Sequence, residues 1–366
     1  MSDKIRKPAP LPDPLAIDVG DIPIPDSGTL VTVDDEFPAS VAYNFAFLGL
    51  GQCGGRIASS MYKIGYRRVA AVNTTRQDMT GLLVPDSNLL DLNTGGAGRD
   101  PELGAKAITG REEEINDLLQ RVWGEGQVDY PFICFGAGGG TGAGIWTAAY
   151  DILKRRYGKV GAIVAMPKNE EGGRVAKNTV RTFTELGNRA FSPLMLIDND
   201  KIKSLYPKTT VSDFWSVSNT GICSLLHLFN RLAGSSSTHK PLDRADFAAL
   251  LASGIVVPGM SVLRQCKTGA DIAEAIRGPL RKNMLANVDI SKASVGACVF
   301  VGGPSVFDSL PIEFLDYAQT ALGRLLAPGA VVYSAVYDGV TPDLRCYFLV
   351  GGLPMPAARL AELGSL

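Results

Sequence analysis

The sequence predicts an α/β protein whose parallel sheet carries helices on both faces, followed by a smaller α+β domain. From residue 43 onward, short apolar runs alternate with glycine-containing loops and longer amphipathic stretches. That alternation is typical of parallel strands buried on both faces. A long helical stretch at residues 212–232 interrupts it, and the strands beyond are grouped with fewer helices between them. Grouped strands of this kind indicate an α+β domain.

Five apolar runs have the length and composition of buried strands: YNFAFLGL, RRVAAVN, PFICFGA, VGAIVAMP and PLMLID. The long helical stretch offers five packing positions: Phe214, Val217, Leu225, Phe229 and Leu232. After it we expect a short helix from Asp243, a helix near 271–286, and strands within 293–303, 330–338 and 344–352.

These elements suggest a division into four parts. Residues 1–40 are rich in proline and lack helical periodicity, which predicts an extended N-terminal arm. Residues 41–211 form the first α/β domain, 212–246 the central helix with the loop after it, and 247–366 the C-terminal domain.

Composition disfavours several functional classes. The formal net charge of -1 gives no general attraction to nucleic acid, so we expect no direct nucleic-acid partner. The six cysteines lie far apart, without the close pairs of zinc sites and redox dithiols. The start, MSDKIRKPAP, has no apolar signal core, which predicts a cytoplasmic protein. Residues 131–150 lack charge, but their glycines predict strand, loop and helix and not a transmembrane segment.

The first glycine loop, GLGQCGGR at residues 49–56, directly follows the first strand. Gly49, Gly51 and Gly54 fit the G-x-G-x-x-G pattern of dinucleotide-binding folds. Such folds hold a ribose with an acidic residue at the end of the second strand, but here that strand ends Asn73-Thr74-Thr75. A nicotinamide-dependent oxidoreductase is therefore an alternative that this strand end disfavours.

Two further glycine loops also stand between a strand and a helix. Residues 136–144 read GAGGGTGAG, and no lysine follows them as in a P-loop. Residues 95–101 read GGAGRDP. Glycines let backbone N–H groups approach phosphates closely, and helix starts attract anions. Three such loops in one domain predict a single polyphosphate held from several sides.

The loops together resemble the tubulin/FtsZ superfamily. GQCGG at 51–55 is similar to the first glycine loop of tubulin, and AVNTT at 71–75 to the second loop of FtsZ. GGAGRDPELGAKA at 95–107 resembles the third FtsZ loop, and GAGGGTGAG the signature loop of the family. The resemblance runs from about residue 43 to 353 and indicates a prokaryotic, FtsZ-like cytomotive GTPase, with TubZ- and CetZ-like proteins as alternatives.

The resemblance implies that GTP or GDP binds here, with Mg²⁺ held through the nucleotide phosphates and no metal site of the protein's own. The residues that it implies near the phosphates are Gly51, Gln52, Cys53, Arg56, Asn73, Ala97, Gly98, Gly138, Gly139, Gly140, Thr141 and Gly142. Glu171 and Arg174 match the ribose loop, and Asn199 matches an asparagine that reaches the sugar or base. Trp215 matches the aromatic that stacks on guanine. Asn219, one helical turn later, matches the residue that reads the guanine edge.

Each of these assignments has a plainer alternative. Trp215 could belong to the apolar core, and Asn199 could simply form a turn. Glu171 and Arg174 could be an exposed ion pair.

The segment PLDRADF at 241–247 resembles the family loop N-x-D-x-x-D that reaches the GTP of the next subunit. The resemblance implies that Asp243 and Asp246 are catalytic and that the partner is a second copy, joined head to tail. The plainer interpretation is helix capping, because Asp243 suits an N-cap and Asp246 suits the positive end of a helix dipole. Both interpretations can hold together.

Three positions depart from the family pattern: Gly55 and Pro241 stand where asparagines are usual, and Thr75 where FtsZ has an acid. The main hypothesis is a filament-forming GTPase for cell division, cell shape or DNA segregation. The departures at 55 and 241 motivate an alternative, a filament-forming or capping homologue with little GTPase activity. The sequence identifies no adaptor protein.

Overall fold

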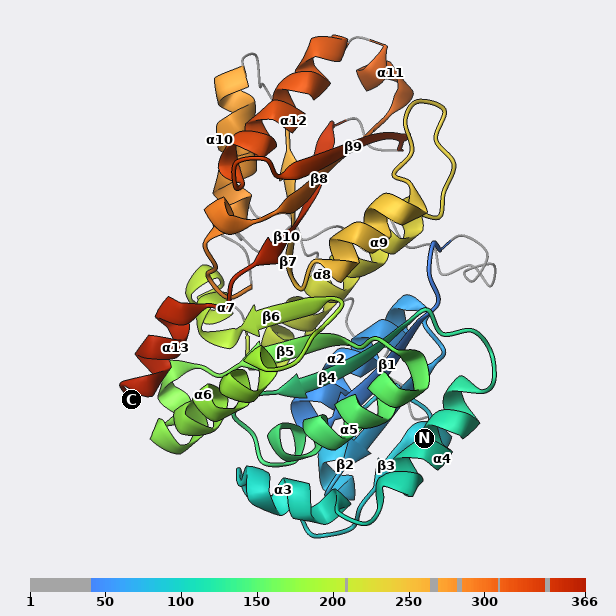
Figure 1. Cartoon of the computed structure of the whole chain (residues 1–366), viewed down its shortest axis with the longest axis vertical. Coiled ribbons are helices and arrows are strands. Elements are labelled where there is room, and N and C mark those ends of the chain that lie inside the picture. Colours follow the sequence, from blue (N-terminus) through green and yellow to red (C-terminus); the bar gives the residue numbers. More distant parts are fainter. Residues whose placement is uncertain (1–40, 208–209, 264–268, 282–284, 309, 340–342) are drawn as a thin grey trace, which may run out of the picture.

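The structure is a computed structural model that describes residues 41–207, 210–263, 269–281, 285–308, 310–339 and 343–366. The proline-rich extension expected at 1–40 lies outside the described residues. The described part of the chain forms an elongated molecule with the sheet running through its length (Figure 1).

Ten strands of the described residues form one sheet in the order β3-β2-β1-β4-β5-β6-β7-β10-β8-β9. Their bounds are β1 Phe45–Leu50, β2 Val69–Asn73, β3 Leu89–Asp91, β4 Tyr130–Gly136, β5 Gly161–Met166, β6 Leu194–Asp198, β7 Ile255–Val262, β8 Val295–Gly302, β9 Val331–Asp338 and β10 Arg345–Leu353. All pairings from β3 to β7 are parallel, whereas β10 runs antiparallel to both β7 and β8. The predicted α/β class and the five predicted strands are confirmed.

Helices cover both faces because the central strands are apolar throughout. Every residue of β1 and β5 is buried, as expected for strands without a solvent face. The helices are α2 Gly51–Ile64, α3 Pro101–Ile108, α4 Glu112–Trp123, α5 Thr141–Tyr157, α6 Gly173–Gly187, α7 Asn199–Leu205, α8 Val211–Leu232, α9 Arg244–Ala252, α10 Gly269–Arg281, α11 Pro304–Phe307, α12 Ile312–Leu325 and α13 Ala357–Gly364. Helices α5 and α6 lie in front of the parallel strands of this sheet in Figure 1.

The long predicted helix is α8, within one residue of its expected start. Leu225 and Phe229 are buried, and Phe214 and Leu232 pack against the core from its margin. The side chain of Val217 lies outside those that the structure describes. The short helix expected from Asp243 is α9, with Asp243 at its N-cap position.

The C-terminal end predicted for the helix near 271–286 is wrong. Helix α10 spans Gly269–Arg281, and the chain beyond 284 is extended. There Leu285 forms an antiparallel bridge with Ile197, and the Ala286 N–H donates to the Leu196 carbonyl. Pairing with β6 therefore satisfies the backbone that a longer helix would have satisfied internally.

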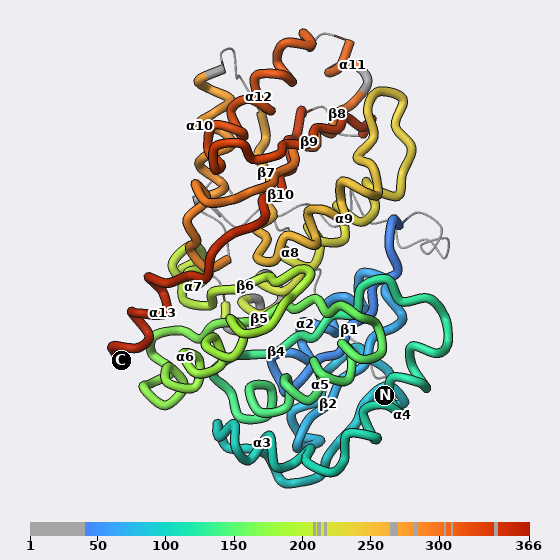
Figure 2. The backbone as a smooth tube through the Cα atoms, in the orientation of Figure 1, coloured from blue at the N-terminus to red at the C-terminus, as the bar shows by residue number. Residues whose placement is uncertain are grey.

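The sheet consists of a first half, β3-β2-β1-β4-β5-β6, and a second half, β7-β10-β8-β9. The two halves are joined by few backbone pairs. Strands β6 and β7 share the single register pair Leu194 and Ile255, while β7 pairs with β10 along its whole length. The chain enters the second half after α8 and α9, and returns after β10 so that α13 lies against α6 of the first half (Figure 2). The domain limits expected from the sequence stay a prediction.

Candidate functional site

A cavity of about 470 Å³ opens at the carboxyl ends of the parallel strands in the first half of the sheet. The loops after β1, β3 and β4, which are the three predicted glycine loops, all line it. Parallel strands end at the same edge, and neighbouring β1 and β4 lie where the strand order reverses. This reversal point is the usual ligand crevice of open α/β sheets.

The glycines of these loops let the loops touch. A Cβ atom on Gly140 would lie 2.8 Å from the Ala97 Cβ and 2.8 Å from the Asp100 nitrogen, so only glycine fits there. Gly51, the first residue of α2, has φ +68, a value that favours glycine. Since Gly51 begins α2 and Thr141 begins α5, the N-termini of two long helices border the cavity. Both present backbone N–H groups and a partial positive charge.

Most of the residues predicted from the sequence lie on the cavity wall. They are Gly51, Gln52, Cys53, Arg56, Ala97, Gly98, Gly138, Gly139, Gly140, Thr141, Gly142, Glu171, Asn199, Trp215 and Asn219. Asn199 is the first residue of α7 and not part of a turn, and Trp215 borders the cavity and not the apolar core. The structure therefore brings these residues together, while the contacts assigned to each of them stay predictions.

Charge on the wall is balanced. The ionisable wall residues are the cations Arg56 and Arg99 and the acids Asp78 and Glu171, besides Cys53. The Arg56 guanidinium lies 5.5 Å from the Trp215 ring centroid, an arrangement that steadies the ring. Burial raises the pKa of the Cys53 thiol to about 12, so the thiol stays protonated and is a poor nucleophile. An anion in the cavity would therefore be held mainly by backbone N–H groups.

Residues 44–207 match the tubulin/FtsZ family, GTPase domain. The chain is 27% identical to the tubulin-like protein TubZ of Bacillus cereus, over 88% of this chain and 82% of the relative. It is also 27% identical to cell division protein FtsZ 1 of Pyrococcus abyssi, over 74% of this chain and 71% of the relative.

The chain contains a tubulin/FtsZ GTPase domain.

Solved structures of family members share the fold. GDP-form protofilaments of TubZ from Bacillus thuringiensis serovar israelensis superpose with a TM-score of 0.78 at 17% identity, covering 89% of this chain and 92% of that one. CetZ from Methanosaeta thermophila gives a TM-score of 0.69 at 22% identity, covering 88% and 90%. These solved structures therefore share the fold of this chain over most of its length.

Two residues of the predicted tubulin/FtsZ set are not on the wall. Asn73 is buried, and its Oδ1 accepts the Thr74 N–H at 2.8 Å. Arg174 is largely exposed and forms an ion pair with Asp100 at 3.0 Å, because α6 directs it across the loop before α3. The alternative ion pair between Glu171 and Arg174 is not formed, and Glu171 Oε1 instead accepts the Lys168 N–H.

The structure adds wall residues that the sequence did not single out. Asp78 follows β2 within a short 3-10 helix and places a carboxylate on the wall. FtsZ has an acid at the position that Thr75 occupies here. In this chain, Asp78 supplies an acid three residues later. A second departure, Gly55, is not on the wall, and a Cβ there would meet Leu82 at 3.1 Å.

Asp243 and Asp246 are not part of this cavity. Between them, the Arg244 carbonyl accepts a hydrogen bond from the Tyr43 hydroxyl at 2.6 Å, and Tyr43 lies two residues before the start of β1. The two acids therefore lie at the amino edge of the sheet, opposite the cavity. Burial first, and then the charge of Asp243, raise the pKa of Asp246 above its ordinary value. Asp243 makes no capping hydrogen bond with its side chain, so that part of the capping interpretation is wrong.

Among the described residues, no helix combines the length and the apolar character that crossing a membrane requires.

Proposed function

We propose that this chain binds GTP in the cavity and that a second copy, docked head to tail, completes the active site with Asp243 and Asp246. One observation carries the proposal: the cavity and the two acids lie at opposite edges of the same sheet. A single chain cannot bring them together, but a translated copy can. TubZ structures with comparable folds have been solved as protofilaments in GDP and GTPγS forms, which supports this arrangement.

The cavity wall suits each part of the nucleotide. The three glycine loops offer N–H groups to the phosphates, and the starts of α2 and α5 add their partial positive charge. Trp215 offers a ring face to the guanine, and Asn199 and Asn219 offer amide groups that can both donate and accept. Glu171 can accept from ribose hydroxyls.

The family implies Mg²⁺, and the wall fits a cation held mainly by the nucleotide. Mg²⁺ prefers oxygen ligands and is commonly bound through substrate phosphates with one or two protein groups. The wall offers the Asp78 carboxylate and the Thr141 hydroxyl. When bound, the cation would neutralise charge developing on the phosphates.

Hydrolysis requires a positioned water more than covalent chemistry by the protein. The partner copy's two carboxylates would orient that water and accept its proton. The raised pKa of Asp246 increases its proton affinity and suits it to accept this proton. Because the contact joins two different surfaces, repetition gives an open filament and not a closed dimer.

A mixing experiment tests this division of the site. Variant A carries Asp243→Asn and Asp246→Asn, which leaves its cavity intact. Variant B carries Gly139→Glu; the nearest atom to a Cβ there is 3.9 Å away, so the fold accepts the side chain and its charge repels phosphate. Each variant alone should release phosphate at background rates. A one-to-one mixture should recover up to about a quarter of wild-type turnover if copies pair at random, because cavities of A meet acids of B.

Several outcomes decide between hypotheses. No recovery on mixing, with both variants folded by circular dichroism, would show that the acids do not act across the interface. Filaments in electron microscopy without phosphate release by the wild type would favour the homologue with little GTPase activity. The cellular role and the cytoplasmic location stay predictions.

A further inference from the structure

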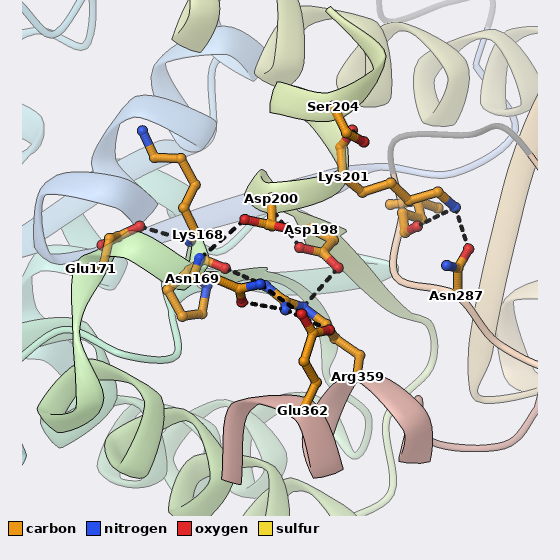
Figure 3. A network of polar contacts seen from close by, with 12 residues as sticks. Lys168, Asn169, Glu171, Asp198, Asp200, Lys201, Ser204, Asn287, Arg359 and Glu362 are labelled. Carbon is orange, nitrogen blue, oxygen red and sulfur yellow. Dashed lines mark hydrogen bonds and ion pairs between the residues drawn. The ribbon is translucent and has the colours of Figure 1, made fainter. Parts of the chain in front are cut away.

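Arg359 is a buried arginine on the last helix, α13, and only 6% of its surface is exposed. Its Nη2 donates to the Pro167 carbonyl at 2.8 Å, and its Nη1 donates to Asn169 Oδ1 at 2.5 Å. Its Nε lies 3.1 Å from Asp198 Oδ2, close enough for an ion pair although the N–H is not aligned for a hydrogen bond. Figure 3 shows Arg359 reaching toward Asn169 and Asp198.

The partners of Arg359 belong to two segments of the cavity wall. Pro167 itself lines the cavity, and the loop that it begins continues to Glu171. Asp198 ends β6 and immediately precedes Asn199, which also lines the cavity. Arg359 therefore joins the loop expected at the ribose to the helix start expected at the sugar or base.

The partners of Arg359 are also linked to one another and to α13. Asn169 donates from its side chain to Glu362 of α13 at 2.6 Å, and its N–H donates to Asp200 at 3.0 Å. Asp198 caps α7 by accepting the Asp200 N–H at 3.1 Å. Each segment therefore depends on the others for its position. Among the described residues, Arg359 of α13 is the only cation within ion-pair distance of the buried Asp198 carboxylate.

We propose that Arg359 is a positioning residue that couples the docking of α13 to the recognition of the ribose and base. The inference rests on the proposed guanine-nucleotide site. The proposed phosphate loops follow β1, β3 and β4, and the described contacts of Arg359 reach only Pro167, Asn169, Asp198 and Glu362. Loss of Arg359 should therefore weaken contacts to the nucleoside and leave contacts to the phosphates unchanged.

The experiment compares two ligands of the same full-length chain by titration calorimetry: GDP, and inorganic tripolyphosphate, which has no nucleoside. Arg359→Met should weaken GDP binding by about tenfold, the size typical of residues in a coupling network. Tripolyphosphate affinity should change by less than about twofold. Arg181→Met is the matched control, because Arg181 is exposed, pairs with Glu102 of α3 and Glu185 of α6, and should leave both affinities unchanged when replaced.

A second variant protects the test against loss of folding. Arg359→Met leaves Asp198 without its partner, so the double variant with Asp198→Asn removes both charges while keeping an oxygen that can cap α7. It should show the same selective loss of GDP affinity. By reciprocity, GDP should slow amide hydrogen exchange in α13 of the wild type but not of Arg359→Met.

The outcomes separate the inference from the function on which it rests. Equal weakening of GDP and tripolyphosphate in the double variant would show a merely structural role and overturn the inference. So would unchanged GDP affinity in Arg359→Met. A wild-type chain that binds no GDP would overturn the proposed function, and this inference with it.

Discussion

His227 lies buried in α8, with its Nδ1 3.2 Å from the Tyr66 hydroxyl oxygen. Burial first, and then the charge of Arg231, lower the pKa of its imidazole to about 3. The folded state therefore keeps the ring neutral, while the unfolded chain takes up a proton as the pH falls below about 6.5. Stability from this residue is fully present above pH 6.5 and is lost between there and pH 3.

We therefore expect His227→Gln to flatten part of the pH dependence of stability. Between pH 7.5 and 5.5 the free energy of unfolding of the wild type should fall by about 1.4 kcal/mol more than that of the variant. Urea unfolding at both pH values measures this difference. Parallel pH profiles for the two proteins would contradict the assignment.

Trp215 allows a test of the guanine position. Loss of a stacking aromatic typically costs about 1–3 kcal/mol of binding free energy per base. Trp215→Ala should weaken GDP binding by about this amount and remove any change of tryptophan fluorescence on binding. Trp123→Phe is the control, because Trp123 is the buried last residue of α4 and does not line the cavity. Equal effects of both substitutions would show that Trp215 does not contact the base.

At the scale of elements, α3 and α5 cross in close contact through Gly104 and Gly144. A Cβ on Gly144 would lie 2.3 Å from the Pro101 carbonyl oxygen and 2.6 Å from the Ala105 nitrogen. Gly144→Ala must therefore push α3 away, together with the glycine loop that precedes it. We expect a loss of about 1–3 kcal/mol in the free energy of unfolding, as for other overpacked sites, and weaker GDP binding.

Gly187→Ala is the matched control for that substitution. Gly187 is at the exposed end of α6, and nothing lies within 4 Å of a Cβ there. Chemical denaturation and GDP titration of both variants make the comparison. If Gly144→Ala behaved like Gly187→Ala, the contact between the helices would be looser than the structure indicates.

The elements that the sequence predicts well are those with a strong local pattern. Apolar runs identify β1, β2, β4, β5 and β6, and the long amphipathic pattern identifies α8. Strand β7 was not predicted because Pro258 and Gly259 interrupt its sequence. Strand β7 tolerates these residues because it pairs with β6 only at Ile255. Along the rest of that edge, no neighbouring strand of the described residues requires a backbone N–H donor from β7.

The same distinction holds for the site. The glycine loops are recognisable from local sequence alone, so their place on the cavity wall could be predicted. Arg359 could not, because its partners Pro167, Asn169 and Asp198 are distant in the sequence and nothing near Arg359 indicates them. Asp78 was missed since its position after β2 differs from the family pattern.

At the scale of the whole molecule, the two halves of the sheet touch narrowly, and α13 connects them a second time. The second half leads through β10 into α13, and α13 carries Arg359 to the wall of the cavity. A displacement of the second half can therefore reach the nucleotide site through this helix. The domain limits at 41–211 and 247–366 stay predictions, and α13, at the end of the second range, packs against α6 of the first.

The separation of cavity and acids also determines how activity should depend on protein concentration. In the proposed mechanism, each chain binds nucleotide alone but acquires the acids only from a neighbour. Groups supplied across an interface can be worth about 10³–10⁵ in phosphoryl transfer, so GTP turnover per chain should rise at least about tenfold as assembly sets in and then level off. Phosphate release at saturating GTP, from nanomolar to micromolar protein, measures this rise. Variant A, with Asp243→Asn and Asp246→Asn, should stay at background throughout because its cavities never meet a carboxylate. Turnover per chain that is constant over the whole range would mean that one chain contains its complete active site, since dilution removes neighbours but leaves the cavity unchanged.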